Sequence, residues 1–126
     1  MHRVLISLAS NYQQENHLSE AHRVLAEVIS SAAYTEAIWT EAEGKAPCAQ
    51  HSTYLNQLVS AETELTADEL NCRLKEMEQA LGRTPEMRRQ GIVPIDLDLR
   101  LWDSDHYHQR DWQRSYITRL LPSVPH

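Results

Sequence analysis

Two aspartates, Asp96 and Asp98, stand one residue apart in the stretch Ile95-Asp96-Leu97-Asp98-Leu99-Arg100-Leu101-Trp102. Apolar residues recur at every second position of this stretch, which is typical of a β-strand with one face in a core. Both carboxylates would leave the same face of the strand, with their Cα atoms roughly 7 Å apart. Carboxylates this close repel each other unless a cation lies nearby, and oxygen ligands suit a hard ion such as Mg²⁺. The alternative is a strand whose outer face is simply solvated.

Arginine is concentrated around this aspartate pair. Residues 1–82 contain five Lys and Arg against twelve Asp and Glu, whereas residues 83–119 contain seven Arg against six Asp and Glu. The planar fork of arginine suits bidentate contact with phosphate oxygens. Carboxylates for a metal and guanidinium groups for an anion in one segment favour a metal–nucleotide site. The net charge of −6 argues against general nucleic-acid binding.

The composition predicts an ordinary globular protein. With 126 residues and 41% hydrophobic residues, the chain fits a single domain spanning residues 1–126. No apolar run approaches the roughly 20 residues needed to cross a bilayer, and the apolar stretch after Met1 is too brief for a signal peptide. Cys48 and Cys72 show no paired spacing. We therefore expect reduced thiols, a cytoplasmic location and no membrane partner.

Hydrophobic periodicity predicts four strands and three helices. The expected strands are 3–8, 33–39, 54–64 and 95–102, and the expected helices are 18–29, a segment after Thr66, and 111–121. The middle helix is the best specified, because Thr66 and Glu69 form a capping box and Gly82 stands where a left-handed C-terminal residue belongs. A long loop over 41–53 and an arginine-bearing loop over 83–94 complete the chain. The order β-α-β-β-α-β predicts an α+β, ferredoxin-like fold, a four-stranded antiparallel sheet with both helices on one face.

Four segments in this order resemble one known family. They are Leu8-Ala9-Ser10-Asn11 at the end of the first strand, Tyr54-Leu55-Asn56 after the long loop, the Glu-x-x-x-Gly-Arg run Glu78–Arg83, and Ile95-Asp96-Leu97-Asp98. The family is that of the 6-hydroxymethyl-7,8-dihydropterin pyrophosphokinases of folate biosynthesis. The resemblance implies an enzyme that transfers diphosphate from ATP to the pterin hydroxymethyl group with two Mg²⁺ ions. Its partners would be these small molecules, with the protein a monomer or a weak homodimer.

The resemblance also implies a role for individual residues. Asp96 and Asp98 would hold the metal ions, and Arg83 and Arg89 would contact phosphates. Nucleotide contacts would come from Glu78, Arg114 and His108, and pterin contacts from Asn56, Tyr54 and Tyr116. Independently of the resemblance, Asn56 is an unusual residue for the middle of a strand, and a buried Asn needs hydrogen-bond partners. The alternative for Arg83 and Arg89 is a solvated helix end, where cations are favoured.

Several positions depart from the family pattern. The loop before the acidic strand reads Gln90-Gly91-Ile92-Val93 where the family has Trp-Gly-Pro-Arg, and Pro85 replaces a loop arginine. Ala9 replaces a glycine, which a position with positive φ would resist. Two alternatives to the enzyme follow. One is a degenerate homologue that binds pterin or nucleotide without turnover, and the other is a ferredoxin-like protein-interaction module.

Overall fold

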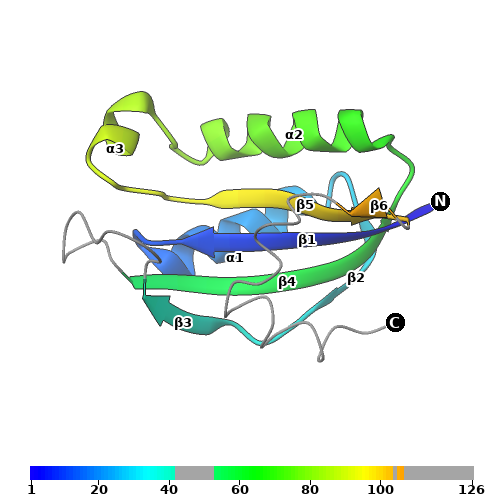
Figure 1. Ribbon diagram of the computed structural model, residues 1–126, viewed down its shortest axis with the longest axis horizontal. Helices are drawn as coiled ribbons and strands as arrows, with labels where there is room; N and C mark the ends of the chain where they lie inside the picture. The colour runs from blue at the N-terminus through cyan, green and yellow to red at the C-terminus, as the bar shows by residue number, and fades with distance from the viewer. Residues whose placement is uncertain (42–52, 104, 107–126) are drawn as a thin grey trace.

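The computed structural model describes residues 1–41, 53–103 and 105–106. The elements in chain order are β1 (His2–Ser10), α1 (Gln14–Leu25), β2 (Ser30–Tyr34), β3 (Ile38–Glu41), β4 (Thr53–Thr63), α2 (Ala67–Ala80), α3 (Pro85–Arg89), β5 (Asp96–Trp102) and β6 (Asp105–His106) (Figure 1). The helix predicted over 111–121 and most of the loop predicted over 41–53 lie outside the described residues. In the described part of the chain, no helix is long and apolar enough to cross a membrane.

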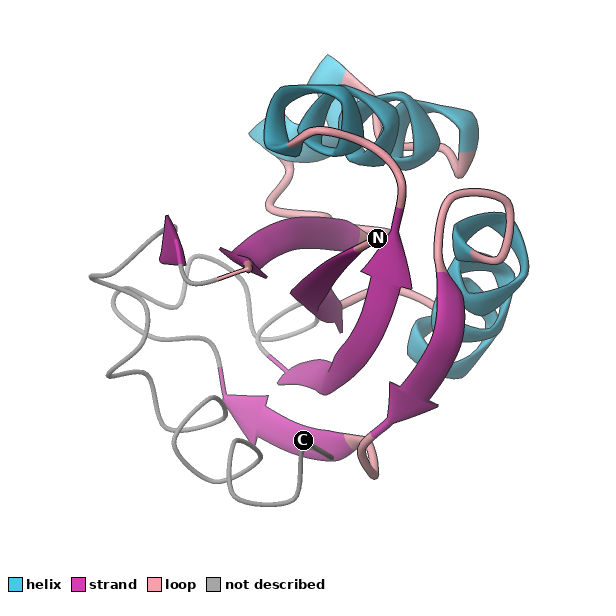
Figure 2. Cartoon of the chain, turned by 90° about the vertical axis from the view of Figure 1, so that its right-hand side faces the viewer, coloured by secondary structure: helices cyan, strands magenta, loops and turns pink. Residues whose placement is uncertain are grey.

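The strands form one antiparallel sheet of order β2-β4-β1-β5-β6, with β3 also paired to β4. Helices α1 and α2 both pack on the same face of this sheet (Figures 1 and 2). The ferredoxin-like α+β fold expected from the sequence is therefore confirmed. The strand count is higher than predicted, because β6 extends one edge and the expected second strand is divided into β2 and β3.

The division of the second strand falls at Thr35. Its hydroxyl accepts the backbone N–H of Leu58 at 3.1 Å, and its backbone N–H donates to the Leu58 carbonyl at 2.9 Å. A side chain thus takes one of the ladder bonds that a continuous strand would make. The chain leaves the sheet here and rejoins β4 at Ile38, opposite Asn56.

The main core lies between the sheet and the two helices. It takes the helix-facing residues of the three central strands and the apolar stripes of α1 and α2, among them Val4, Ile6, Leu8, Leu18, Ala21, Leu25, Leu55, Val59, Leu70, Leu74, Met77, Ile95, Leu97 and Leu99. The prediction for the second helix is confirmed: α2 begins with the capping box of Thr66 and Glu69, and Gly82 adopts φ +106° after its end. Helix α1 is displaced, beginning at Gln14 and ending at Leu25 rather than Ile29.

The alternation predicted for β5 fails at its end. The pairing with β1 shifts there, so that Ile6 faces Leu99 and Leu5 faces Leu101. Arg100 is the extra residue, which is a β-bulge. Leu101 consequently joins the small second cluster around Leu5, on the face away from the helices, instead of the main core. A bulge inverts the faces of the residues that follow it, and strict alternation cannot anticipate this.

Replacing Glu69 with Ala tests the capping box. The Thr66 backbone N–H, donated at 3.0 Å, lowers the pKa of Glu69 below its ordinary value of 4.5. A carboxyl whose folded pKa is lowered contributes stability that is fully present above its ordinary pKa and is lost as the pH falls through the folded pKa. We expect Glu69→Ala to lower the melting temperature at pH 7, and the difference from wild type to shrink towards pH 3.

Glu76→Ala is the control for this prediction. Glu76 lies in the middle of the same helix and makes an exposed ion pair with Arg73 at 3.8 Å, an interaction that contributes little. Its substitution should change the melting temperature less than Glu69→Ala at pH 7. A difference for Glu69→Ala that persists at pH 3 would contradict the ionised capping box.

Candidate active site on the sheet face away from the helices

The aspartate pair lies on the face of the sheet opposite to the helices. In the register of β5 and β1, Asp96 pairs with Ala9 and Asp98 pairs with Ser7. On the other side of β1, Ala9 pairs with Asn56 of β4. Asn56, Ala9 and Asp96 therefore form a row across three strands, and at about 4.8 Å per strand the outer two stand roughly 10 Å apart. The small side chain of Ala9 lies between them.

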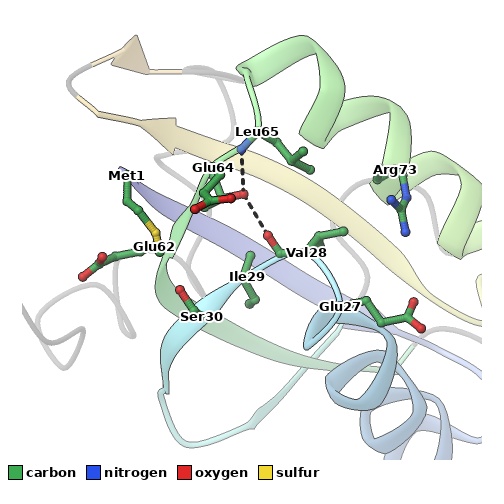
Figure 3. A pocket seen from close by; sticks show the side chains of 10 residues that line it. Met1, Glu27, Val28, Ile29, Ser30, Glu62, Glu64, Leu65 and Arg73 are labelled. Carbon is green, nitrogen blue, oxygen red and sulfur yellow. Dashed lines mark hydrogen bonds between the residues drawn. The ribbon is translucent and has the colours of Figure 1, made fainter.

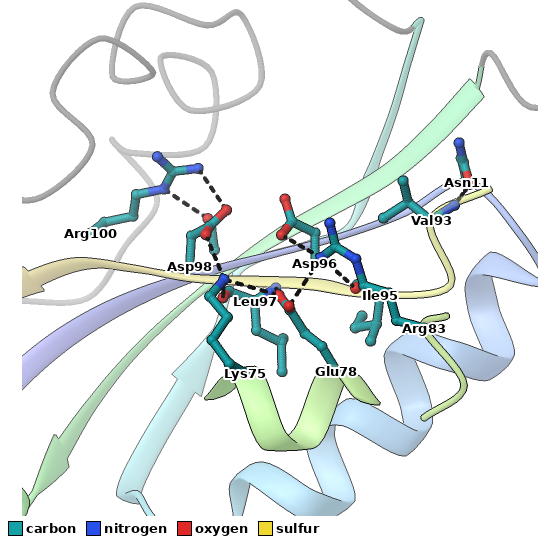
Figure 4. A network of polar contacts seen from close by, with 11 residues as sticks. Asn11, Lys75, Glu78, Arg83, Val93, Ile95, Asp96, Leu97, Asp98 and Arg100 are labelled. Atoms are coloured by element: carbon teal, nitrogen blue, oxygen red, sulfur yellow. Dashed lines mark hydrogen bonds and ion pairs between the residues drawn. The ribbon is translucent and has the colours of Figure 1, made fainter. Parts of the chain in front are cut away.

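Three cationic side chains surround the aspartates (Figure 4). Lys75 Nζ lies 3.4 Å from Asp98 Oδ1, and Arg83 Nη1 lies 3.2 Å from Asp96 Oδ1. Arg100 Nη2 lies 3.6 Å from Asp98 Oδ2. The arginine clustering seen in the sequence thus brings positive charge directly onto the acidic pair.

Glu78 of α2 organises the outer edge of β5. Its side chain is only 6% exposed, and its Oε2 accepts the backbone N–H of Leu97 at 2.7 Å. The same carboxylate pairs with Arg83 at 3.0 Å and with Lys75 at 3.3 Å. Lys75 also donates to the Leu97 carbonyl at 3.3 Å, and Arg83 to the Ile95 carbonyl at 3.4 Å. Side chains of α2, and that of Arg83 just after it, therefore satisfy backbone groups that a neighbouring strand would otherwise bond.

The surroundings of Asp98 disfavour its negative charge. Burial raises the pKa of Asp98 above its ordinary value, and the like charge of Asp96 raises that pKa further, while Lys75 and Arg100 oppose the rise. Burial alone would lower the pKa of Lys75, yet three neighbouring carboxylates, that of Asp98 first, raise it above the ordinary value. Facing carboxylates of this kind gain from a divalent ion between them.

The donor set fits Mg²⁺ as a partly hydrated ion. The described residues contain no group of three or more His, Cys, Asp and Glu side chains that could hold a metal. Asp96 and Asp98 would then supply two protein ligands, and water or phosphate oxygens the rest. This is how Mg²⁺ is usually bound, through one or two carboxylates.

A hollow of about 450 Å³ lies next to Lys75 and Arg83, the side chains that contact the aspartates, and neither aspartate lines it. It is lined by Lys75, Glu78, Gln79, Arg83, Thr84, Pro85 and Arg88. Among the described residues it is Arg88, rather than the predicted Arg89, that lines this hollow. Pro85, which replaces a family arginine, occupies the first turn of α3, where proline is favoured.

Asn11, which directly follows β1, binds the end of the arginine-bearing loop 83–94. Its Nδ2 donates to the Gly91 carbonyl at 2.8 Å, and its Oδ1 accepts the Val93 N–H at 2.5 Å. A backbone bond from Asn11 to Val93 of 3.0 Å completes the attachment. The nearby Ala9 lies within β1 and does not have positive φ, so alanine is acceptable at this family glycine position.

Asn56 is 1% exposed and lies on the same side of the sheet as the aspartates, the side away from the helices. Its Nδ2 donates to Thr40 Oγ1 at 2.7 Å and lies near the carbonyls of Ile38 and Tyr54 at 3.3 and 3.4 Å. Its Oδ1 accepts no hydrogen bond from the part of the chain that the structure describes. An unsatisfied buried acceptor costs free energy, which a ligand donor would recover.

The structure thus brings Asp96, Asp98, Arg83 and Glu78 together, with Asn56 across β1. Tyr54 lies half-buried in β4, two residues before Asn56. The predicted His108, Arg114 and Tyr116 lie outside the described residues. No individual role was predicted from the sequence for Lys75, Arg88 or Arg100. For Lys75, a sequence signal was its i,i+3 spacing from Glu78, which places both side chains on one face of a helix.

A second hollow, of about 340 Å³, lies at the opposite end of β1 (Figure 3). It contains three glutamates, but Glu27 and Glu62 point away from each other (Figure 3). Its buried hydroxyl, that of Thr63, already donates to the Val28 carbonyl at 2.8 Å. No residue of the predicted site lines this hollow.

The fold and site define a ferredoxin-like α+β protein whose acidic pair and cationic rim suit a metal-bound anion. The chain belongs to the 7,8-dihydro-6-hydroxymethylpterin-pyrophosphokinase family, whose model matches residues 5–126. The mitochondrial folate synthesis bifunctional protein of Pisum sativum is 37% identical over 76 residues. That match covers 54% of this chain and 15% of the pea protein, so the chain spans a small part of this relative.

Replacing Glu78 with Ala tests its support of the β5 edge. The Leu97 N–H would lose its acceptor, and Arg83 and Lys75 would lose a shared counter-charge. We expect the free energy of unfolding, measured by urea denaturation, to fall by roughly 2–3 kcal/mol. Hydrogen exchange at the Leu97 amide should accelerate in the same variant.

Glu78→Gln is the matched variant, because its oxygen can still accept from Leu97 while its charge is gone. It should lose less stability than Glu78→Ala and retain slower exchange at Leu97. Equal losses in the two variants would show that the bond to Leu97 does not stabilise this edge.

Proposed function

We propose that this protein transfers the β,γ-diphosphate of ATP to the hydroxymethyl oxygen of 6-hydroxymethyl-7,8-dihydropterin. The observation that supports the proposal is the row of Asn56, Ala9 and Asp96, in which the amide proposed to bind the pterin and the carboxylate proposed to hold the metal lie on opposite sides of Ala9. Family membership supports the same reaction. The acceptor oxygen forms a bond to the β-phosphorus, the bond from that phosphorus to the oxygen bridging to the α-phosphate breaks, and AMP leaves.

Asp96 and Asp98 are the residues that would hold magnesium, with two ions as the proposed number. Bound Mg²⁺ would neutralise charge on the transferred phosphates and lower the pKa of the acceptor hydroxyl. The protein's own contribution is position. Both aspartates stand on a strand hydrogen-bonded to β1, so their separation is fixed by the sheet rather than by a loop.

The hollow of about 450 Å³ would take the nucleotide phosphates. Lys75, Arg83 and Arg88 line it, and cations here would stabilise charge on the phosphates as the diphosphate moves. Glu78 holds Arg83 and Lys75 at its rim through ion pairs of 3.0 and 3.3 Å. We therefore assign Glu78 to positioning of the nucleotide's cationic partners.

The pterin would lie over Ala9 with its polar edge towards Asn56. The Oδ1 of Asn56 is directed by three contacts of Nδ2, which leave the oxygen for a ring N–H donor. Tyr54 would shape the same pocket. Further roles for His108, Arg114, Tyr116 and Arg89 stay predictions from the family resemblance, as do a cytoplasmic location and a monomer or weak homodimer.

Binding of pterin or nucleotide without turnover is the second candidate. It is favoured by one observation, the absence of the family Trp and Arg from Gln90-Gly91-Ile92-Val93. The retained aspartates and the cationic hollow favour the enzyme, because they supply the neutralisation that diphosphate transfer requires.

Asp98→Asn and Asp96→Asn test the reaction directly. Each should lower the rate of acceptor-dependent AMP release by roughly 100-fold or more, since charge stabilisation at the phosphates would be lost. The measurement is a coupled AMP assay with ATP, Mg²⁺ and the dihydropterin. Glu76→Gln, an exposed change on α2, serves as the control and should retain activity. Absent AMP release from wild type, with ligand binding intact by calorimetry, would replace the enzyme with the binding-only candidate.

Adjacent arginines on α3 give a second, matched test. Arg88 lines the hollow, so Arg88→Met should raise KM for ATP by roughly tenfold through loss of a charge-assisted phosphate contact. Arg89→Met should raise it less. The reverse order would return the phosphate contact to Arg89, the residue that the family resemblance indicated.

A further inference from the structure

Arg100 is a buried charge that the proposed reaction does not use. Its residue is 2% exposed, and it is the largest of the fully buried side chains in the described part of the chain. Its Nε donates to Ser7 Oγ at 2.8 Å, and its Nη2 lies 3.6 Å from Asp98 Oδ2. Burying a guanidinium is costly, and apolar residues of similar volume often serve a core as well or better. A role in packing alone does not account for an arginine here.

The β-bulge directs this side chain towards the acidic pair. Arg100 has no opposite residue on β1, because the pairing passes from Leu99 with Ile6 to Leu101 with Leu5. Bulges commonly re-aim a side chain beside an active site. Here the guanidinium lies on the same side of the strand as the Asp98 carboxylate (Figure 4).

Three cations lie close to Asp98 and its neighbouring carboxylates. Among the residues that the structure describes, the ion pairs join three carboxylates, those of Glu78, Asp96 and Asp98, to the three cations Lys75, Arg83 and Arg100. A divalent ion alone would approach a carboxylate, that of Asp98, which already lies beside the cations of Lys75 and Arg100. A divalent ion carried by a polyphosphate brings its own anionic oxygens, which the same cations can bind.

We infer that Arg100 acts as an internal counter-charge to Asp98, which weakens the binding of a bare divalent ion and makes metal entry depend on the nucleotide. This inference rests on the proposed function, because it takes Asp98 as a metal ligand. Arg100 is then a positioning residue. It acts on the metal through Asp98, because the guanidinium and the metal ion would both interact with the same carboxylate.

Removal of the Arg100 charge is expected to change the affinity for a divalent ion in the direction opposite to that caused by structural damage. An opposite charge within about 4–6 Å changes the affinity of a carboxylate for a proton by roughly 10- to 1000-fold. Removing the Arg100 charge should therefore raise the affinity for Mn²⁺ alone by at least about tenfold. Loss of the shape of the site would lower that affinity instead.

The experiment measures Mn²⁺ binding by electron paramagnetic resonance, without nucleotide, for wild type, Arg100→Met and Arg100→Gln. Methionine has a similar length without charge, and glutamine retains a donor for Ser7, so one variant remains if the other fails to fold. Both should bind Mn²⁺ more tightly than wild type. The gain in affinity that a non-hydrolysable ATP analogue gives should be smaller in both than in wild type.

Arg100→Lys, which keeps the charge, and Arg73→Met, which removes an exposed arginine of α2, are the controls and should match wild type. Unchanged or weaker Mn²⁺ binding in folded Arg100→Met and Arg100→Gln would overturn the inference. Failure of the proposed function has a different result: wild type would bind no Mn²⁺ even with the ATP analogue, or Asp98→Asn would bind it equally well.

Discussion

The bond from the Leu97 N–H to the carboxylate of Glu78 is the interaction on which the site depends. Strand β5 lies near the edge of the sheet, and β6 pairs only with its last two residues, Leu101 and Trp102. The remaining outer edge has backbone groups that need partners. Glu78, itself 6% exposed on its side chain, supplies one of them from a helix. Part of the edge is thereby satisfied without a neighbouring strand, and Asp96 beside it stays partly accessible.

The same carboxylate links stability to the site's charge. A buried glutamate requires counter-charges, and Arg83 and Lys75 provide them at 3.0 and 3.3 Å. Those two cations also contact the aspartates, which places them at the rim of the hollow. The cationic rim is therefore a consequence of how the sheet edge is closed. The site and the fold use the same residues.

Much of this could be predicted from the sequence, because the relevant signals are local. The capping box at Thr66, the glycine at Gly82 and the period-2 pattern around Asp96 each depend on a few neighbouring residues. The outer end of β5 could not be predicted in the same way. The bulge at Arg100 depends on its register with β1, which lies some ninety residues away in the chain, and the pattern Leu97, Leu99, Leu101 gives no sign of it.

The residues of the candidate site could be predicted better than the contacts that they make. Asp96, Asp98, Arg83 and Glu78 were singled out by residue type and resemblance, yet the interruption at Thr35 and the choice between Arg88 and Arg89 depend on tertiary contacts. A helix turns each residue by about 100°, so neighbouring arginines on the short α3 helix face different directions. Only the packed structure decides which of them meets the hollow.

The metal-binding carboxylates proposed here lie on a rigid strand, whereas the arginines proposed to contact phosphates lie on a connecting segment. The carboxylates of Asp96 and Asp98 stand on a strand bonded to β1, whereas Arg83 and Arg88 lie on a segment bounded by Gly82 and Gly91, both with positive φ. Asn11 fastens the far end of that segment to β1. Under the proposed function, Arg83 would exchange a carboxylate for a phosphate oxygen. One charged pair then replaces another, which keeps the free-energy change of the exchange small.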